Sequence, residues 1–414
     1  MLKFSSLLGL FFFIAVVWLF SENRRRFPWR TLFWGLVLQF SVALFILKTE
    51  VGLWAFEAMQ MAVGKLIGSA AEGTGIVFGA LARHDSMGKV FGANDAAILA
   101  IEVVGTIIII SATSSLLYHF GILQRVVRSM AWVMRRLMGT SGSETVSAAA
   151  NIFMGQTEAP LTIKPYLPRM TRSELHAMMT GGFATIAGSV LTVYTGVFKI
   201  PVGDLLTASS MSAIASLYMA KIMIPETEVS ETAAGETADI RPESINAIDA
   251  ICLGASDGMK LALNVVAMLV AFVALVSFAN FLIAKGLVHV GYTGRQPLQE
   301  ALGYLNWPLA RMMGIPTAEC QKVAQILGER VVLNEFIGYM HLAEMKAQLS
   351  ERSFRITTYA LCGFANLGSI AIQIGGIGVL VPNRSKDLAR LGAKAMGVGL
   401  ASCYTTACIV GIIG

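Results

Sequence analysis

The sequence is poor in charged side chains. Only 14% of its 414 residues are charged, whereas an ordinary soluble domain carries about 25%. The net charge of +6 is spread over several loops, which argues against a nucleic-acid-binding surface. The five cysteines form no C-x-x-C pair, so we expect small buried side chains rather than disulfides or metal ligands. The five histidines show no metal-ligand spacing either.

Long apolar runs take the place of the missing charges. Hydrophobic residues make up 55% of the chain, and most runs approach the roughly 20 residues that cross a bilayer. The first run lacks a small-x-small cleavage site and is followed by four arginines, so we expect a retained span rather than a signal peptide. The runs are 4–20, 31–47, 96–118, 204–220, 265–284, 356–381 and 396–414.

Three positive clusters orient the chain. They lie at residues 24–30, 125–136 and 384–394, and Lys and Arg stay on the cytoplasmic side of a membrane. This rule predicts an all-α polytopic membrane protein with both termini outside and an amphipathic helix at 124–138 on the inner surface. The eight predicted spans are 4–20, 31–47, 96–118, 174–197, 204–222, 249–285, 356–381 and 392–412.

An acidic stretch divides the chain. Residues 225–244 hold six acidic residues, one arginine and two prolines, which is typical of a flexible linker. We therefore expect scaffold spans and the inner-surface helix at 1–140, and a first hairpin, broken helix and following span at 141–224. The linker would occupy 225–248, a long helix and an outer amphipathic segment 249–315, and a second hairpin, broken helix and last span 316–414.

Two stretches do not fit full spans. Residues 142–165 contain Gly-Gln-Thr-Glu-Ala-Pro at 155–160, and Pro160 cannot continue a helix but can begin a new one. Each half would be ~10–13 residues, or ~15–20 Å long, about half the hydrocarbon thickness. The pattern predicts a re-entrant hairpin with a polar tip. Residues 319–346, with Asn334 and Glu335 at their centre, predict a second hairpin.

Two of the predicted spans carry a similar interruption. Residues 181–189 and 362–369 both contain Gly-Phe-Ala, then Thr or Asn, then an aliphatic residue, with Gly-Ser nearby. Each interruption follows a predicted hairpin, and the predicted topology makes the two hairpins enter from opposite sides. The expected architecture is therefore an inverted repeat with broken helices, as in many secondary transporters.

Three glutamates stand out because an ionisable side chain inside a membrane is costly. Glu158 and Glu335 lie at the two predicted hairpin tips. Their polar neighbours at a helix break favour a functional role over simple capping of free N–H groups. Glu102 lies within the span 96–118, where a packing or interfacial role is at least as reasonable.

Amide and hydroxyl groups accompany these carboxylates. Neither 181–189 nor 362–369 contains Lys or Arg, so the expected cargo is neutral. Phe364 could offer a face to a flat ring or only pack against its surroundings. The amide and carboxylate groups suit a nucleoside, and they suit other polyols as well. The accompanying polar residues are Gln156, Thr157, Asn366 and Ser369.

Three motifs together resemble the concentrative nucleoside transporter family. They are residues 155–160, residues 334–336 (Asn-Glu-Phe) and residues 363–369 (Gly-Phe-Ala-Asn-Leu-Gly-Ser). In segment order and loop character the resemblance extends over nearly the whole chain. It implies a bacterial protein of the inner (plasma) membrane, a homotrimer joined through the long helix at 249–285, and no nucleic-acid partner.

The resemblance also implies substrate-binding positions in both hairpins and both broken spans. The residues expected to face the base are Gln156, Thr157 and Glu158, with Val190 and Phe364 packed against it. The residues expected to hold the ribose hydroxyls are Glu335, Asn366 and Ser369.

A sodium site is implied between the first hairpin and the span after it. Asn151 and Thr185 would supply side-chain oxygens, and Met154 and Ile186 would supply backbone carbonyls. Both side-chain positions keep an oxygen, which favours Na⁺, although some bacterial members use H⁺ and both residues could serve packing. Na⁺ would be the coupling ion, and no other cofactor is expected.

The function that the resemblance implies is secondary active symport of nucleosides into the cell, driven by a cation gradient across the lipid bilayer. The alternative is a membrane-embedded enzyme or a passive channel that uses Glu158 and Glu335. No enzyme is expected, because the sequence offers no nucleophile–histidine arrangement, metal cluster or phosphate loop. Residues 73–79 only faintly resemble a nucleotide loop.

Overall fold

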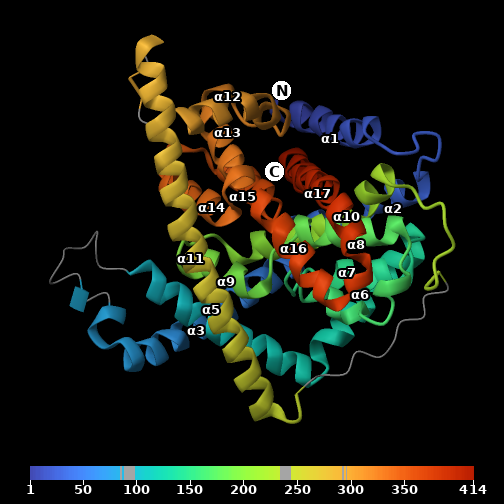
Figure 1. The fold of residues 1–414 in the computed structure, drawn as a ribbon, viewed down its shortest axis with the longest axis horizontal. Helices are drawn as coiled ribbons and strands as arrows, with labels where there is room; N and C mark the ends of the chain where they lie inside the picture. The colour runs from blue at the N-terminus through green and yellow to red at the C-terminus, as the bar shows by residue number, and fades with distance from the viewer. Residues whose placement is uncertain (84–85, 88–97, 234–243, 291–292, 295) are drawn as a thin grey trace.

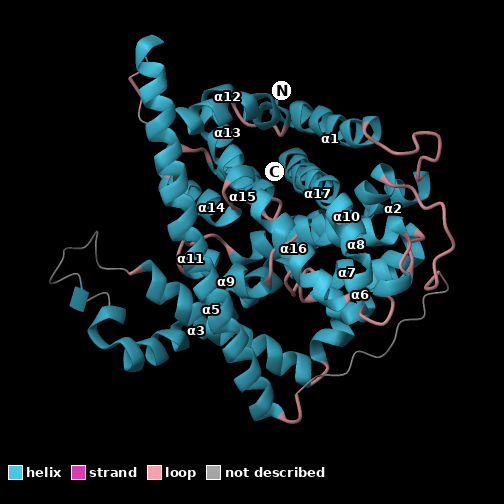
Figure 2. Cartoon of the chain, viewed as in Figure 1, coloured by secondary structure: helices cyan, strands magenta, loops and turns pink. Residues whose placement is uncertain are grey.

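The structure is a computed structural model that describes residues 1–83, 86–87, 98–233, 244–290, 293–294 and 296–414. Within this described part the chain forms helices, turns and loops and no strand (Figure 2). The predicted all-helical fold is therefore confirmed. Residues 96–97 of a predicted span and residues 234–243 of the predicted linker lie outside the described part.

Seven of the described helical stretches are long and apolar enough to cross a membrane. They correspond to seven of the eight predicted spans. The eighth, 356–381, is divided between two shorter helices. The seven stretches are Leu2–Leu19, Trp29–Lys48, Leu99–His119, Arg172–Gly196, Val202–Met223, Ala247–Leu287 and Pro382–Ile413.

The N-terminal third contains a helix that the sequence did not predict. After α1 (Leu2–Leu19) and α2 (Trp29–Lys48), α3 runs over Glu50–Phe78 and is followed by the 3₁₀ turn η1 (Gly79–Ala82). Thr49 begins α3, because its side chain accepts a hydrogen bond from the Gly52 amide at 3.0 Å. Residues 73–75 lie inside this helix, so they do not form a loop that could hold a phosphate group.

An amphipathic helix follows α5 (Leu99–His119), as predicted. This helix, α6 (Ile122–Met138), lies between Gly121 and Gly139, whose positive φ angles favour glycine. Its buried residues repeat every three or four positions, which is the spacing of one helix face. They are Gln124, Val127, Ala131, Met134 and Met138.

The first predicted hairpin has one helical arm only. Its first arm, α7, spans Gly142–Ala150 and begins with a capping box between Ser141 and Glu144. The second arm was expected to be a helix, but it consists of the 3₁₀ turns η3 (Ala159–Ile163) and η4 (Leu167–Arg169). The expectation was wrong because this arm also holds prolines at 165 and 168, and each proline removes a backbone donor that a helix needs.

The second predicted hairpin has two helical arms. They are α13 (Thr317–Val332) and α14 (Glu335–Glu344), which contact each other and are separated by only two residues. Asn334 begins α14, since its side chain accepts a hydrogen bond from the Ile337 amide at 3.0 Å. The predicted helix–break–helix pattern is therefore confirmed in this segment, which ends in the turn η6 (Lys346–Gln348).

Both predicted interruptions of the spans occur. The first separates α8 (Arg172–Ala184) from α9 (Gly188–Gly196), and the second separates α15 (Glu351–Leu361) from α16 (Leu367–Leu380). The two breaks cross, because the Phe364 amide donates a hydrogen bond to the Thr185 carbonyl at 3.2 Å. Gly363 makes the crossing possible, since a Cβ there would lie 2.6 Å from the Phe183 carbonyl oxygen. The two Gly-Phe-Ala segments thus lie against each other.

Two further helices form the centre and one side of the molecule. The central helix α10 (Val202–Met223) is buried along nearly its whole length and contacts α2, α8 and α17 (Ser385–Ile413). The long helix α11 (Ala247–Leu287) extends along one side of the molecule in Figure 1 and packs against α5. The remaining elements are η5 (Val288–Val290), α12 (Pro297–Met312) and η7 (Pro382–Arg384).

Candidate functional site

Four interruptions of the helices meet around one cavity of about 130 Å³. They are the turns after α7, the break before α9, the α13–α14 tip and the break before α16. All eight residues that the sequence analysis assigned to substrate binding line this cavity. They are Gln156, Thr157, Glu158, Val190, Glu335, Phe364, Asn366 and Ser369.

Two asparagines turn helix N-termini towards the cavity. Asn334 caps α14, and Asn366 caps α16 by accepting a hydrogen bond from the Ser369 amide at 2.8 Å. Both asparagines line the cavity. A helix N-terminus carries free N–H groups and a partial positive charge, which favour acceptor groups and negative charge nearby. Glu335, the first residue of α14, occupies such a place.

Glu335 is held by two donors from other elements. Its Oε1 accepts a hydrogen bond from the Tyr194 hydroxyl at 3.0 Å, and its Oε2 accepts one from the Asn366 amide at 3.0 Å. An ionised carboxylate offers about four lone-pair sites. Two fixed donors therefore orient the carboxylate and leave it able to accept from hydroxyl groups of a ligand.

The amide of Gln156 is fixed in a similar way. Its Nε2 donates to the Ser369 hydroxyl at 3.3 Å, and its Oε1 accepts from the Gln373 amide at 3.1 Å. Gln373 is fully buried and also donates to the Met179 carbonyl at 3.1 Å. These bonds join the first hairpin to the helix after the second break.

Glu158 is more exposed than Glu335. One of its oxygens accepts a hydrogen bond from the Gly155 amide at 3.0 Å, so the capping role considered for this residue is present. The residue is nevertheless exposed, and it lines both the main cavity and a neighbouring one of about 200 Å³. Glu102, the third glutamate, lies elsewhere and lines a separate cavity between α3, α5 and the end of α9.

The four predicted sodium ligands lie at the turn after α7 and at the first break. Asn151 is fully buried, and among the described residues neither the oxygen nor the nitrogen of its amide has a hydrogen-bond partner. A Cβ added to Gly181 would lie 3.3 Å from that amide, and the Thr185 hydroxyl donates to the Gly181 carbonyl at 2.9 Å. Buried polar atoms rarely remain unsatisfied, so this amide fits a cation site. Met154 is partly buried and Ile186 is fully buried.

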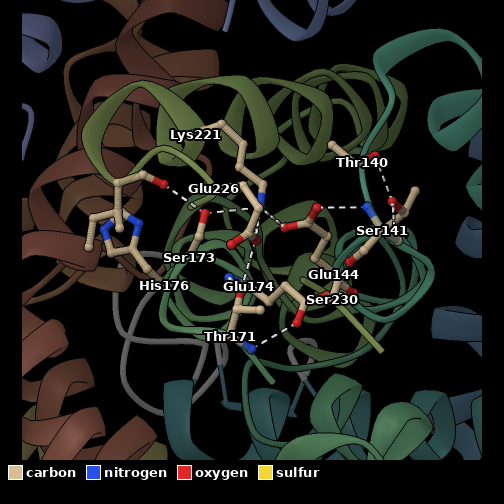
Figure 3. A network of polar contacts seen from close by, with 12 residues as sticks. Thr140, Ser141, Glu144, Thr171, Ser173, Glu174, His176, Lys221, Glu226 and Ser230 are labelled. Carbon is tan, nitrogen blue, oxygen red and sulfur yellow. Dashed lines mark hydrogen bonds and ion pairs between the residues drawn. The ribbon is translucent and has the colours of Figure 1, made fainter. Parts of the chain in front are cut away.

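A buried polar network supports the beginning of the first hairpin (Figure 3). Lys221 of α10 forms ion pairs with Glu144 of α7 at 2.7 Å and with Glu226 at 3.2 Å. The Ser230 hydroxyl donates to Glu174 of α8. The first residues of the acidic linker therefore contact α10 and α8 through the side chains of Glu226 and Ser230.

Three polar residues around the site escaped the sequence analysis. Tyr194 lies four residues after Val190, so the shared helix face was a usable signal. Gln373 lies four residues after Ser369 and could have been found in the same way. Arg330, near the end of α13, is fully buried and donates to the carbonyls of Ala360 and Gly363. Its guanidinium does not line the cavity, and the described residues that do line it include no lysine or arginine.

Three family models match the chain. A model described as "Na+ dependent nucleoside transporter C-terminus" matches residues 204–411, and one described as "Na+ dependent nucleoside transporter N-terminus" matches residues 8–81. A gate model described as "Nucleoside recognition" matches residues 100–201. The three matches cover the predicted spans and both hairpins in order.

Curated relatives and solved structures agree with these models. The chain is 39% identical to "Uncharacterized transporter YutK" of Bacillus subtilis over 98% of both chains. It is 38% identical to "Solute carrier family 28 member 3" of Mus musculus over 98% of this chain, but it spans only 58% of that protein's length. It is also similar to "Structure of CNTnw in an inward-facing substrate-bound state", with a TM-score of 0.93 and 37% identity over 100% of this chain and 98% of that one.

The Bacillus subtilis relative is described as a transporter and the mouse relative as a solute carrier. The resemblance inferred from the three motifs is confirmed over the whole length of the chain. Because a family model matches half of the chain and a full-length relative is 39% identical, this chain belongs to the sodium-dependent, or concentrative, nucleoside transporter family.

Proposed function

We propose that this chain is a secondary active symporter that imports nucleosides, driven by a sodium gradient. The observation that carries the proposal is the convergence of four helix interruptions on one cavity lined by Glu158, Glu335 and their amide neighbours. Carboxylates and broken helices inside apolar spans are costly, and a bound polar cargo explains their presence.

The geometry supports a division of roles within the cavity. Glu335 is oriented by Tyr194 and Asn366 and keeps free lone pairs, which suits the adjacent hydroxyls of a ribose. Gln156, Thr157 and Glu158 lie on the first hairpin and offer both donors and acceptors, which suits the edge of a base. Val190 and Phe364 supply apolar surface for the flat ring.

Sodium would bind beside this cavity. The unpartnered Asn151 amide supports the assignment, together with the Thr185 hydroxyl and the carbonyls of Met154 and Ile186. A Na⁺ ion prefers such oxygen ligands. One charge moving down 100 mV supplies ~2.3 kcal/mol for import. H⁺ remains the alternative coupling ion.

The proposed architecture has eight spans in a bacterial inner membrane, both termini outside, and two hairpins that enter from opposite sides as an inverted repeat. The hairpins and broken helices would move as a unit past a scaffold built around α11. The exposed apolar residues of α11 support its role as the contact of a homotrimer. The segments 1–140, 141–224, 225–248, 249–315 and 316–414 would be the functional divisions.

Uptake of radiolabelled uridine into proteoliposomes under an imposed Na⁺ or H⁺ gradient tests the function. We expect uphill accumulation that stops when the sodium gradient is collapsed, with unaltered uridine recovered from the lumen. A chemically changed product would favour the membrane-embedded enzyme. Equilibration without accumulation would favour the passive channel. Empty vesicles and vesicles with equal sodium on both sides are the controls.

A further inference from the structure

Arg330 has an unusual environment for a charged side chain. It lies two residues before the end of α13, and it is 0% exposed. Within the part of the chain that the structure describes, its hydrogen bonds go to two main-chain carbonyls and to the Cys403 sulfur at 3.2 Å, none goes to a carboxylate, and its Nε has no partner. Burying an unpaired charge is unfavourable unless hydrogen bonds compensate. The burial of this charged group therefore needs a reason other than the packing of its side chain.

The compensation comes from both sides of the second helix break. One guanidinium nitrogen donates to the carbonyl of Ala360 in the last turn of α15, and the other donates to the carbonyl of Gly363 in the break at 3.2 Å. The final carbonyls of a helix lack partners and carry partial negative charge. A planar guanidinium can bridge two such oxygens because its donors are fixed in a fork.

The bridge connects the two elements that carry the proposed ribose contacts. Arg330 lies five residues before Glu335, and Gly363 lies three residues before Asn366. Asn366 in turn donates to Glu335 at 3.0 Å. The tip of the second hairpin and the second break are thus joined twice, once inside the cavity and once behind it.

We propose that Arg330 is a positioning residue that holds the break after α15 against the second hairpin, so that Glu335 and Asn366 face the ribose together. The inference rests on the proposed function. Arg330 itself stays behind the cavity, so it acts through these two residues and leaves the cavity suited to a neutral cargo.

The test measures selectivity for the ribose hydroxyls. Dissociation constants of uridine and 2′,3′-dideoxyuridine are determined by calorimetry on the purified full chain at saturating sodium. The selectivity ratio is the constant for dideoxyuridine divided by the constant for uridine, and it is compared between parent and variants. We expect Arg330→Met to lower the ratio at least about tenfold, since oriented hydrogen bonds to Glu335 are lost. The matched control Leu327→Ala truncates a buried side chain one turn earlier in α13. It should leave the ratio unchanged, because a general destabilisation of the hairpin lowers the affinity for both ligands by a similar factor.

Each outcome decides a separate point. If the parent protein does not distinguish the two ligands, the ribose assignment of the proposed function fails. If the parent distinguishes them and folded Arg330→Met keeps the parental ratio, the positioning role is overturned. If Arg330→Met does not fold, Arg330→Lys decides instead. A lysine keeps the charge without the two-carbonyl fork, so we expect the ratio to fall about threefold, and an unchanged ratio overturns the proposal.

Discussion

At the scale of single residues, the cavity depends on polar groups whose partners come from distant parts of the chain. Glu335 accepts from Tyr194 of α9 and from Asn366 before α16, and Gln156 is bonded to Ser369 and Gln373 of α16. Each of these groups is therefore oriented before a ligand arrives. Preorganisation of this kind lowers the entropic cost of binding.

Replacing Glu335 by glutamine should weaken uridine binding. The change removes the charge and turns one acceptor into a donor, and a hydrogen bond to a charged group contributes about 1.5–3 kcal/mol. We expect the dissociation constant from calorimetry to rise at least about tenfold. Glu329→Gln is the control, because Glu329 is a buried carboxylate of the same hairpin that does not line the cavity. Equal affinities in parent and Glu335→Gln would contradict the ribose assignment.

Replacing Thr185 by alanine should reduce the response to sodium. The change removes the side-chain oxygen proposed as a ligand, so we expect the sodium concentration for half-maximal uptake to rise about tenfold. Thr180→Ala is a close control, since both hydroxyls donate to the carbonyl four residues earlier and only Thr185 lies at the break. A similar sodium response in the two variants would argue against the proposed site.

Residues of the cavity could be predicted from the sequence where they belong to a recognisable local motif. Glu158 and Glu335 stand out from sequence alone, because a carboxylate beside a helix break within apolar stretches is unusual. Arg330 could not be placed in this way. Its carbonyl partners are those of Ala360 and Gly363, 30 and 33 residues away, and any residue type can supply a carbonyl.

At the scale of elements, the two broken spans form one crossing. Gly363 has φ +156°, and a Cβ there would also lie 2.8 Å from the Cys403 sulfur. Gly363→Ala should therefore lower the free energy of unfolding by about 1–3 kcal/mol and reduce uptake, as measured by thermal unfolding in detergent and by vesicle assay.

Gly375→Ala serves as the control for this substitution. Gly375 lies in α16, and a Cβ there would meet nothing within 4 Å. Alanine favours a helix over glycine by about 1 kcal/mol, so this variant should be as stable as the parent or more so. Equal stability of the two variants would contradict the prediction, because it would mean that the neighbouring atoms can move away from an added Cβ at residue 363.

The second hairpin contains a pH-sensitive pair outside the candidate spans. His341 Nδ1 lies 2.6 Å from a carboxylate oxygen of Glu329, and this hydrogen bond raises the pKa of His341 despite an opposing effect of burial. Because the folded-state pKa is the higher one, the stabilisation is present below about pH 6.5 and is lost as pH rises through the folded-state pKa.

We therefore expect the parent to lose more thermal stability between pH 6 and pH 8.5 than His341→Gln does. The difference between the two proteins isolates this pair from the other titrating groups. Parallel stability curves for parent and variant would show that the pair contributes nothing.

The positions of the helix breaks were easier to predict from the sequence than the positions of all the helices. Interruptions at 185–187 and 362–366 follow from polar and glycine residues in apolar runs, and the structure places them as expected. The arm after Pro160 was predicted as a helix because one proline suits a first turn, but the later prolines at 165 and 168 limit it to short turns. α3 was missed because its Glu and Lys residues interrupt the apolar pattern.

At the scale of the whole molecule, α11 stands apart. Its 41 residues correspond to roughly 60 Å of helix, about twice the hydrocarbon thickness of a bilayer. Side chains such as Val270, Leu275 and Phe278 are largely exposed in the single chain. Such a surface suits lipid or another subunit.

We expect native mass spectrometry to give three copies of the 44.3 kDa chain. Phe278→Ala should shift the population towards smaller species, because it removes apolar surface from the proposed contact. Phe33→Ala, which truncates an exposed phenylalanine of α2, should not. A single-copy mass for the parent protein would contradict the trimer.

The hydrogen bond from the Phe364 amide to the Thr185 carbonyl has a thermodynamic consequence. Thr185 belongs to the proposed ion site and Phe364 to the proposed nucleoside site, so we expect an ion that orders the first break to order the second as well. Linkage then requires reciprocity: the factor by which sodium tightens nucleoside binding equals the factor by which the nucleoside tightens sodium binding. An empty carrier would bind either partner weakly, which limits futile leakage of the ion gradient.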